Sequence, residues 1–137
     1  MFKMRRILVL GIVFLVGVLL FFISSCSPSR NQGAYLYERD CSSCHMPDGS
    51  GLGELYPPLA GSDYLKNNQG KLACIIKYGI SDTLTVNGIQ YDVPMEGIKK
   101  LNEVEITNII NYINTAWNNQ LVEQKLEDIS LQLKKCN

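Results

Sequence analysis

The sequence predicts an all-α fold class: one small helical domain that carries a single β-hairpin. Apolar side chains recur at helical spacing in residues 71–79 and 101–117, and this periodicity is the main sequence signal for amphipathic helices. Two alternating runs flank Asn87-Gly88, which is a strong hairpin signal. The sequence contains no internal repeat or low-complexity segment, and its length fits one domain.

The first 25 residues are interpreted as a signal peptide. A basic start, MFKMRR, precedes an uncharged apolar run from Ile7 to Ile23, as in an export signal. The sequence ISSC, which ends at Cys26, resembles the lipobox of bacterial lipoproteins, where cleavage leaves an acylated cysteine. An uncleaved anchor is the alternative, because the run is long for a signal peptide. Both interpretations place the rest of the chain outside the cytoplasm, at a membrane.

The remaining chain is divided by composition. Residues 26–32 are expected as a polar tether, residues 33–118 as the folded domain and residues 119–137 as a helical tail. From residue 26 onward there are ten basic and thirteen acidic side chains. This mild negative charge argues against nucleic acid as a partner.

The domain should begin with a helix that leads into the sequence CSSCH. Residues 34–45 are expected as this helix, and residues 46–62, MPDGSGLGELYPPLAGS, as a loop. The loop contains a G-x-G-x-G pattern, which can mark a nucleotide-binding turn. We do not expect a nucleotide site, because no predicted strand precedes the pattern.

A second helix and a hairpin follow. Leucine and isoleucine side chains share one face of a helix over residues 71–79, which Gly79 is placed to end. Residues 83–93 then alternate on both sides of Asn87-Gly88, and this pattern predicts the hairpin.

A longer helix is expected over residues 101–117. Asn102 can cap its first turn together with Glu105, and Leu101 and Ile106 are placed for a hydrophobic staple. The buried face of this helix should comprise Val104, Ile106, Ile109, Ile110, Ile113 and Trp117.

The tail carries a narrow apolar stripe at helical spacing, formed by Val122, Leu126, Ile129 and Leu133. We expect the tail to pack on its own domain, and docking on a partner is the alternative.

Two cysteines and the chain's single histidine fall within five residues, Cys41–His45. A zinc site would need further ligands, and His45 is poorly placed beside Cys44. A redox dithiol is expected at a strand-to-helix junction of an α/β pattern, which the sequence lacks. In an exported protein, C-x-x-C-H is the attachment motif of haem c. We therefore expect one covalent haem c, with Cys41 and Cys44 as thioether positions and His45 as the proximal iron ligand.

A second axial ligand is identified by elimination. After residue 26 the chain has no second histidine and two methionines, Met46 and Met95. Met46 adjoins His45 and cannot reach the opposite face of the haem. Met95 lies between the hairpin and the last helix, where it can bind the iron, as methionine does in many electron-transfer haems. The alternative for Met95 is a gap-filling core residue.

Taken together, residues from about Gly33 to Trp117 resemble a class I c-type cytochrome. The resemblance rests on CSSCH, YPPLAGSDYL, TVNGIQYDVPM and LNEVEITNIINYINTAW. More narrowly, the chain is similar to cytochrome c modules found alone or fused to copper nitrite reductases and to sugar or alcohol dehydrogenases. The resemblance implies a cytochrome c fold, with a few helices around one haem and the hairpin as an insert before the methionine loop.

The resemblance also implies roles for individual residues. Pro57 falls where the family's proline offers its backbone carbonyl to the second ring nitrogen of His45, a bond that fixes the ring. Gly33 and Tyr37 match first-helix positions that cross the last helix near Tyr112, where the glycine allows close approach and the aromatic rings pack.

Two cysteines remain after these assignments. Cys74 lies opposite the apolar face of its helix and should be near the surface, and Cys136 ends the tail. An oxidising compartment permits a disulfide between them, and two free thiols are the alternative.

The predicted function is one-electron transfer, because two axial ligands leave no position on the iron for a substrate. We expect a carrier rather than an enzyme, anchored through lipid on Cys26 and facing the periplasm or the outer side of the cytoplasmic membrane. Its partners should be a redox donor and a redox acceptor, with no small-molecule substrate. Acting alone and acting as a subunit of a respiratory complex or dehydrogenase are both left open.

The alternative function is a gas-binding or sensing haem protein in which Met95 detaches. Relatives often carry proline directly after the axial methionine, whereas here Pro94 precedes Met95 and Glu96 follows it. This departure leaves the conformation of the methionine loop open.

Overall fold

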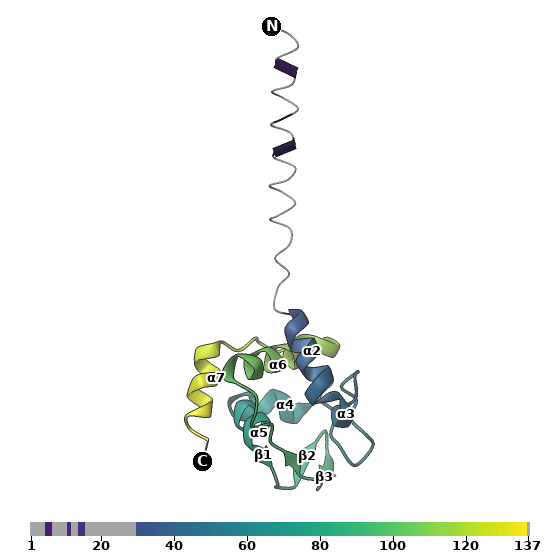
Figure 1. Ribbon diagram of the computed structural model, residues 1–137. Helices are drawn as coiled ribbons and strands as arrows, with labels where there is room; N and C mark the ends of the chain where they lie inside the picture. Colours follow the sequence, from purple (N-terminus) through teal and green to yellow (C-terminus); the bar gives the residue numbers. More distant parts are fainter. Residues whose placement is uncertain (1–4, 7–10, 12–13, 16–29, 137) are drawn as a thin grey trace.

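The computed structural model describes residues 5–6, 11, 14–15 and 30–136, and its folded part is mostly helical (Figure 1). The predicted all-α class with a small hairpin is confirmed. In chain order the elements are α2 Arg30–Asp40, α3 Ser42–His45, α4 Asp63–Asn67, the 3-10 helix η1 Gln69–Lys71, α5 Leu72–Tyr78, β1 Gly79–Ile80, β2 Leu84–Val86, β3 Ile89–Tyr91, β4 Met95–Glu96, α6 Glu103–Thr115, the 3-10 helix η2 Ala116–Asn118 and α7 Leu126–Leu133.

The leader lies largely outside the described residues, as does Cys26. Among the residues that are described, no helix is long and apolar enough to cross a bilayer. Helix α2 begins at Arg30, inside the segment 26–32 that the sequence analysis assigned to a tether.

Helices α2 and α6 cross at close range, and Gly33 makes this approach possible. A Cβ atom on Gly33 would lie 2.3 Å from the backbone oxygen of Asn108 and 2.9 Å from Cβ of Tyr112. One turn later, the ring of Tyr37 packs against the ring of Tyr112, with centroids 5.3 Å apart. The predicted crossing is therefore confirmed, and any larger residue at position 33 would push the two helices apart.

Helix α6 begins as predicted. The Asn102 side chain accepts a hydrogen bond from the Glu105 backbone N–H (3.0 Å), and the Glu105 carboxylate accepts one from the Asn102 N–H (2.9 Å). This reciprocal pair is a capping box, which satisfies two backbone donors at the helix start.

Two residues assigned to the buried face of α6 were placed wrongly. Val104 is 50% exposed, because it lies two positions before Ile106 and so points to the opposite side of the helix. Trp117 lies beyond the helix, which ends at Thr115, and its φ of 49° is in the left-handed region. Its ring instead packs on Tyr37, with centroids 5.0 Å apart.

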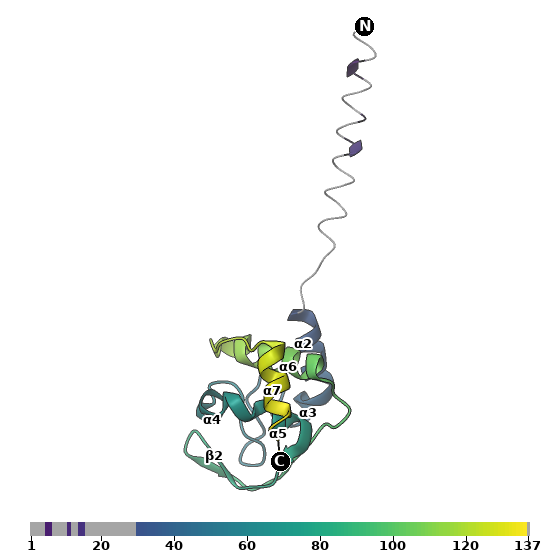
Figure 2. The same cartoon turned by 90° about the vertical axis from the view of Figure 1, so that its left-hand side faces the viewer.

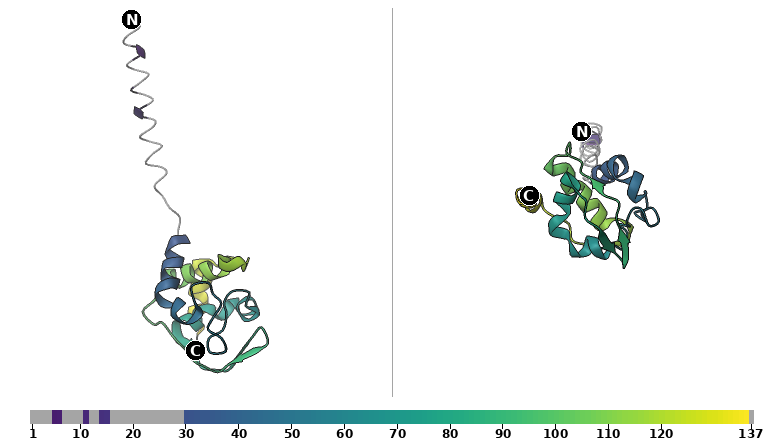
Figure 3. Two further views of the ribbon diagram at one scale, coloured as in Figure 1. Left: turned by 90° about the vertical axis from the view of Figure 1, so that its right-hand side faces the viewer. Right: turned by 90° about the horizontal axis from the view of Figure 1, so that it is seen from below.

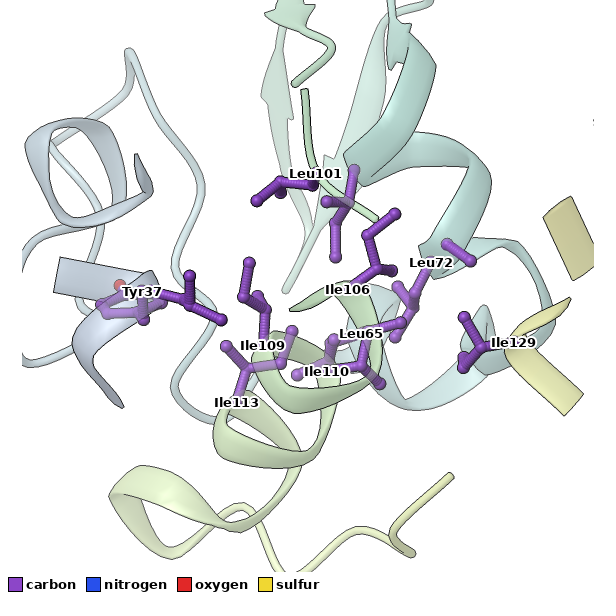
Figure 4. Packing of buried hydrophobic residues seen from close by; sticks show 12 residues of the cluster. Tyr37, Leu65, Leu72, Leu101, Ile106, Ile109, Ile110, Ile113 and Ile129 are labelled. Atoms are coloured by element: carbon purple, nitrogen blue, oxygen red, sulfur yellow. The ribbon is translucent and has the colours of Figure 1, made fainter. Parts of the chain in front are cut away.

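The core lies where α6 meets α2, α4, α5 and α7. Figure 4 shows the isoleucines of α6 between Tyr37 on one side and Leu65 and Leu72 on the other, with Ile129 at the far edge. The α6 residues in this cluster are Ile106, Ile109, Ile110 and Ile113, each nearly or fully buried.

Two short antiparallel pairs of strands complete the fold. Strands β2 and β3 pair with Val86 opposite Ile89, and the two turn residues Asn87 and Gly88 both have positive φ, 51° and 83°. The predicted hairpin is confirmed, since this turn type requires such backbone angles. Strands β1 and β4, with Ile80 opposite Met95, were not predicted, because two-residue strands carry no periodic pattern.

The tail packs back on its own domain, as expected. Figure 2 shows α7 lying across α6 and α5, where Ile129 is fully buried. The apolar stripe is shorter than predicted, because Val122 precedes the helix and is 80% exposed. Cys136, just after α7, forms a disulfide with Cys74 on α5, with Cα atoms 5.6 Å apart.

Candidate haem-binding site

A cavity of about 400 Å³ opens beside the CSSCH motif. Its volume lies within the range of about 300–1,000 Å³ that is typical of ligand pockets. Helices α2, α3, α4, α5 and α6 line it together with the loop after α3 and the segment 79–98. Its apolar lining comprises Leu59, Leu65, Leu72, Ile75, Ile76, Ile80, Leu84, Val86, Val93, Ile98, Ile109 and Ile113.

Cys41 and Cys44 both line this cavity, and neither forms a disulfide. The short turn of α3 sets their spacing: the backbone N–H groups of Cys44 and His45 donate to the Cys41 carbonyl, at 3.2 and 3.0 Å. Burial, and then the neighbouring Asp40 carboxylate, raise the pKa of Cys41 to about 12. The Cys41 thiol therefore stays protonated at neutral pH.

His45 reaches the cavity from the end of α3, and the loop that follows fixes its ring. Nδ1 lies 2.9 Å from the backbone oxygen of Pro57. Because a carbonyl can only accept, Nδ1 carries the hydrogen and Nε2 keeps its lone pair. Burial lowers the pKa of His45, although the Pro57 carbonyl acts in the opposite direction. The neutral ring is the form that binds a metal ion.

Two glycines of the loop after α3 hold this arrangement together, and sequence reasoning missed their role. A Cβ on Gly51 would lie 2.3 Å from the Tyr56 oxygen and 2.7 Å from the Pro57 carbonyl carbon. A Cβ on Gly49 would lie 2.5 Å from the ring of Trp117. Both glycines have positive φ, 69° at Gly49 and 72° at Gly51. The G-x-G pattern, set aside as a nucleotide signal, thus serves close packing around the histidine.

Met95 lines the same cavity from strand β4. Its backbone is held by the pairing of β4 with β1, in which Gly79 has φ 84°. A Cβ on Gly79 would lie 2.3 Å from the Met95 carbonyl oxygen, so only glycine permits this approach. Met46 is not among the described residues that line the cavity, and its carbonyl accepts the Tyr37 hydroxyl at 2.7 Å.

Asp40 also faces the cavity, and sequence reasoning gave it no role. Its side chain is 6% exposed and pairs with Lys100 at 2.9 Å and with the adjacent Arg39. The Arg39 hydrogen bond, which outweighs the effect of burial, lowers the pKa of Asp40. The Asp40 carboxylate beside Cys41 is therefore ionised, and the positive charges of Arg39 and Lys100 balance it.

Within the part of the chain that the structure describes, no three His, Cys, Asp or Glu side chains are grouped to hold a metal ion. The zinc interpretation of CSSCH therefore has no ligand set there. The residues present fit a haem instead: two unpaired thiols one helical turn apart, a neutral imidazole with a free Nε2, a thioether and an apolar cavity. The fold and the site together define a protein of the covalent haem class.

Comparison with known families agrees with this class. The model of the cytochrome c family matches residues 31–117, which is more than half of the chain. The chain therefore belongs to the cytochrome c family, a family whose domain implies covalent haem c.

Individual relatives match about two thirds of the chain. Cytochrome c-552 of Thermus thermophilus is 33% identical over 93 residues, which are 65% of this chain and 62% of the relative. The cytochrome c subunit of the quinone alcohol dehydrogenase of Gluconobacter oxydans is 32% identical over 91 residues, 65% of this chain and 19% of that subunit. The cytochrome subunit of the fructose dehydrogenase of Gluconobacter japonicus is 32% identical over 100 residues, 70% of this chain and 21% of that subunit. The chain thus spans less than two thirds of these relatives.

Proposed function

We propose that this chain is a single-haem electron carrier. Cys41 and Cys44 would hold the haem through thioether bonds, and His45 and Met95 would bind its iron. The observation that carries the proposal is that His45 and Met95 line one apolar cavity from segments fifty residues apart. The haem iron supplies the one-electron chemistry.

The chain's own residues would set the properties of that iron. The Pro57 carbonyl, 2.9 Å from Nδ1, orients the His45 ring and makes its Nε2 a more basic ligand for the iron. The thioether of Met95 is a soft ligand that favours the reduced state and raises the reduction potential. With both axial positions filled, no site for a substrate remains, so the chain would transfer electrons without catalysing a reaction.

We also propose that the carrier works at a membrane between two redox proteins of the cell envelope. Support comes from the lipobox-like sequence before Cys26 and from relatives that are named as cytochrome subunits of dehydrogenases. In the unmodified chain produced in cells, the N-terminal peptide should begin at an acylated Cys26, and a Cys26→Ala variant should lose the mass of the acyl groups. An unmodified chain that keeps residues 1–25 would contradict the lipid anchor and favour an uncleaved one.

Covalent attachment can be tested on the full chain produced with a haem c maturation system. A Cys41→Ser/Cys44→Ser variant should lose all haem after denaturation, whereas the unmodified chain should keep one haem per chain by mass spectrometry. Cys74→Ser/Cys136→Ser is the matched control, because it also replaces two cysteines but away from the cavity. Covalent haem on the first variant, or its loss from the control alone, would contradict the proposed sites.

The gas-binding alternative depends on a loosely held Met95. The unusual order Pro94-Met95-Glu96 favours it. The pairing of β4 with β1, and the close approach at Gly79, favour a fixed methionine and hence the carrier. The two functions differ in whether carbon monoxide can displace Met95.

A further inference from the structure

Basic side chains are absent from the two segments that carry the candidate iron ligands. The segments 41–65 and 79–98, which contain His45 and Met95, together contain no lysine or arginine. From residue 26 onward, the rest of the chain has ten basic and seven acidic side chains. The six carboxylates of the two segments are Asp48, Glu54, Asp63, Asp82, Asp92 and Glu96.

The two segments lie together and form much of the cavity wall. Asp63 at the start of α4 and Asn87 in the hairpin turn exchange hydrogen bonds, at 2.8 and 3.0 Å, which join the segments directly. Asp82 and Glu96 are exposed and line the cavity. Figures 1 and 3 place the hairpin at the end of the molecule opposite the start of α2. We call the surface of segments 41–65 and 79–98 the acidic face.

Two of the lysines that lie near the ends of these segments, Lys77 and Lys100, bind groups outside the face. Lys100 pairs with Asp40, which is outside both segments. The ammonium group of Lys77 donates to the backbone oxygens of Lys99 and Leu101, at 2.7 and 2.5 Å. Conversely, hydrogen bonds from Ser50 lower the pKa of Asp48, so this carboxylate stays ionised at neutral pH.

The acidic face also exposes apolar side chains. Leu52, Leu55, Ile89 and Val93 are each between 42% and 54% exposed, and all four lie on its two segments. Apolar contacts surrounded by charged groups are typical of surfaces that bind another protein. A second copy of the chain is a poor occupant, because it would bring six further carboxylates against the first six.

We propose that the acidic face docks a redox protein that presents a lysine- or arginine-rich patch. The proposal rests on the electron-carrier function and adds the chemistry of the partner to it. Carboxylates around the cavity steer a cationic partner toward it, which raises the association rate and makes that rate sensitive to salt. Because the hairpin of this face lies opposite the start of α2, a chain anchored through its N-terminus would present the hairpin away from the membrane.

The test uses the full chain with its haem reduced, and two small oxidants of opposite charge. We expect tris(phenanthroline)cobalt(III), a cation, to oxidise the protein more slowly as salt is added, and ferricyanide, an anion, to do so faster. A variant with Glu54→Gln, Asp82→Asn and Asp92→Asn should lose roughly 10-fold in its rate with the cation at low salt. These three side chains make no hydrogen bond or ion pair among the described residues, so their neutral analogues should not disturb the fold.

The matched control removes the same charge from the tail, through Glu123→Gln, Glu127→Gln and Asp128→Asn. All three of these residues are exposed, and the control variant should keep most of its rate with the cation. Equal losses in both variants would mean that total charge alone matters, and would overturn the docking proposal.

A second readout does not depend on electron transfer. Hexaamminechromium(III) is a redox-inert paramagnetic cation, and it should broaden backbone amide signals in residues 41–65 and 79–98 in the NMR spectrum. Broadening confined to other surfaces would also overturn the proposal.

If both oxidants react with the protein and salt affects neither rate, the chain is an electron carrier without an acidic docking face. A chain that exchanges electrons with neither contradicts both proposals.

Discussion

At Gly33 a missing side chain decides how closely two helices approach. The glycine lies against the backbone of Asn108 and the side chain of Tyr112, and this contact positions Tyr37, which lines the cavity. The same reasoning applies to Gly51 beside Pro57 and to Gly79 beside Met95. The absence of a side chain at Gly51 and at Gly79 thus allows the close packing beside His45 and beside Met95, on the two sides of the candidate haem site.

Gly33→Ala should destabilise the holoprotein by about 1–3 kcal/mol, since the new methyl group overlaps the Asn108 oxygen. The measurement is urea unfolding, followed by helical circular dichroism. Gly70→Ala is the control, because a Cβ there meets nothing within 4 Å and φ is not positive. It should change the free energy of unfolding by less than about 0.5 kcal/mol. Equal effects of the two substitutions would contradict the close crossing of α2 and α6.

At the scale of elements, the disulfide between Cys74 and Cys136 fastens the tail to α5. Hydrogen bonds add to it: the Asn114 side chain donates to the Val122 carbonyl at 2.8 Å, and Gln124 exchanges two with Asn111, at 2.7 and 3.0 Å. Ile129 supplies the buried contact. The tail is therefore part of the folded unit rather than a loose extension.

Removing this disulfide, which links cysteines 62 residues apart, should lower the free energy of unfolding by about 2–4 kcal/mol. The comparison is urea unfolding of Cys74→Ser/Cys136→Ser against the unmodified chain, without reductant. The unmodified chain treated with reductant should fall to the stability of the variant and gain two hydrogens in mass. No gain in mass on reduction would show that the two thiols are free.

Elements with a strong local signal could be predicted from the sequence, and those defined by distant contacts could not. The capping box at Asn102 and the Asn87-Gly88 turn are short-range patterns. Strands β1 and β4 exist because two distant segments meet at Gly79, and the left-handed turn at Trp117 follows from its packing on Tyr37. Helix α4, with Ser62 capping it at 3.1 Å, was missed although Ser-Asp-Tyr-Leu contains the cap.

The same division applies to the candidate site. The spacing of CSSCH indicates a haem attachment without any structure, and elimination alone leads to Met95. The cavity that His45 and Met95 share is a property of the folded chain, as are the neutral state of the His45 ring and the packing of Gly49 and Gly51. These features depend on contacts between residues far apart in sequence.

For the whole molecule, we propose one haem cavity with His45 and Met95 as axial ligands, and one charged docking face. The segments that contain these two residues also contain the six carboxylates of that face, so the haem and the docking surface would lie side by side. The central claim is that Met95 closes the sixth position on the iron. If it does, the chain carries electrons; if it does not, the iron is open to gases.

The most direct test is the absorption spectrum of the full chain with its covalent haem, before and after carbon monoxide is added. We predict a low-spin spectrum, a far-red sulfur-to-iron band in the oxidised protein and no change in the spectrum of the reduced protein with carbon monoxide. Met95→Ala should lose the band and bind the gas. A high-spin spectrum, or ready carbon monoxide binding by the unmodified chain, would contradict the account and favour a gas-binding protein.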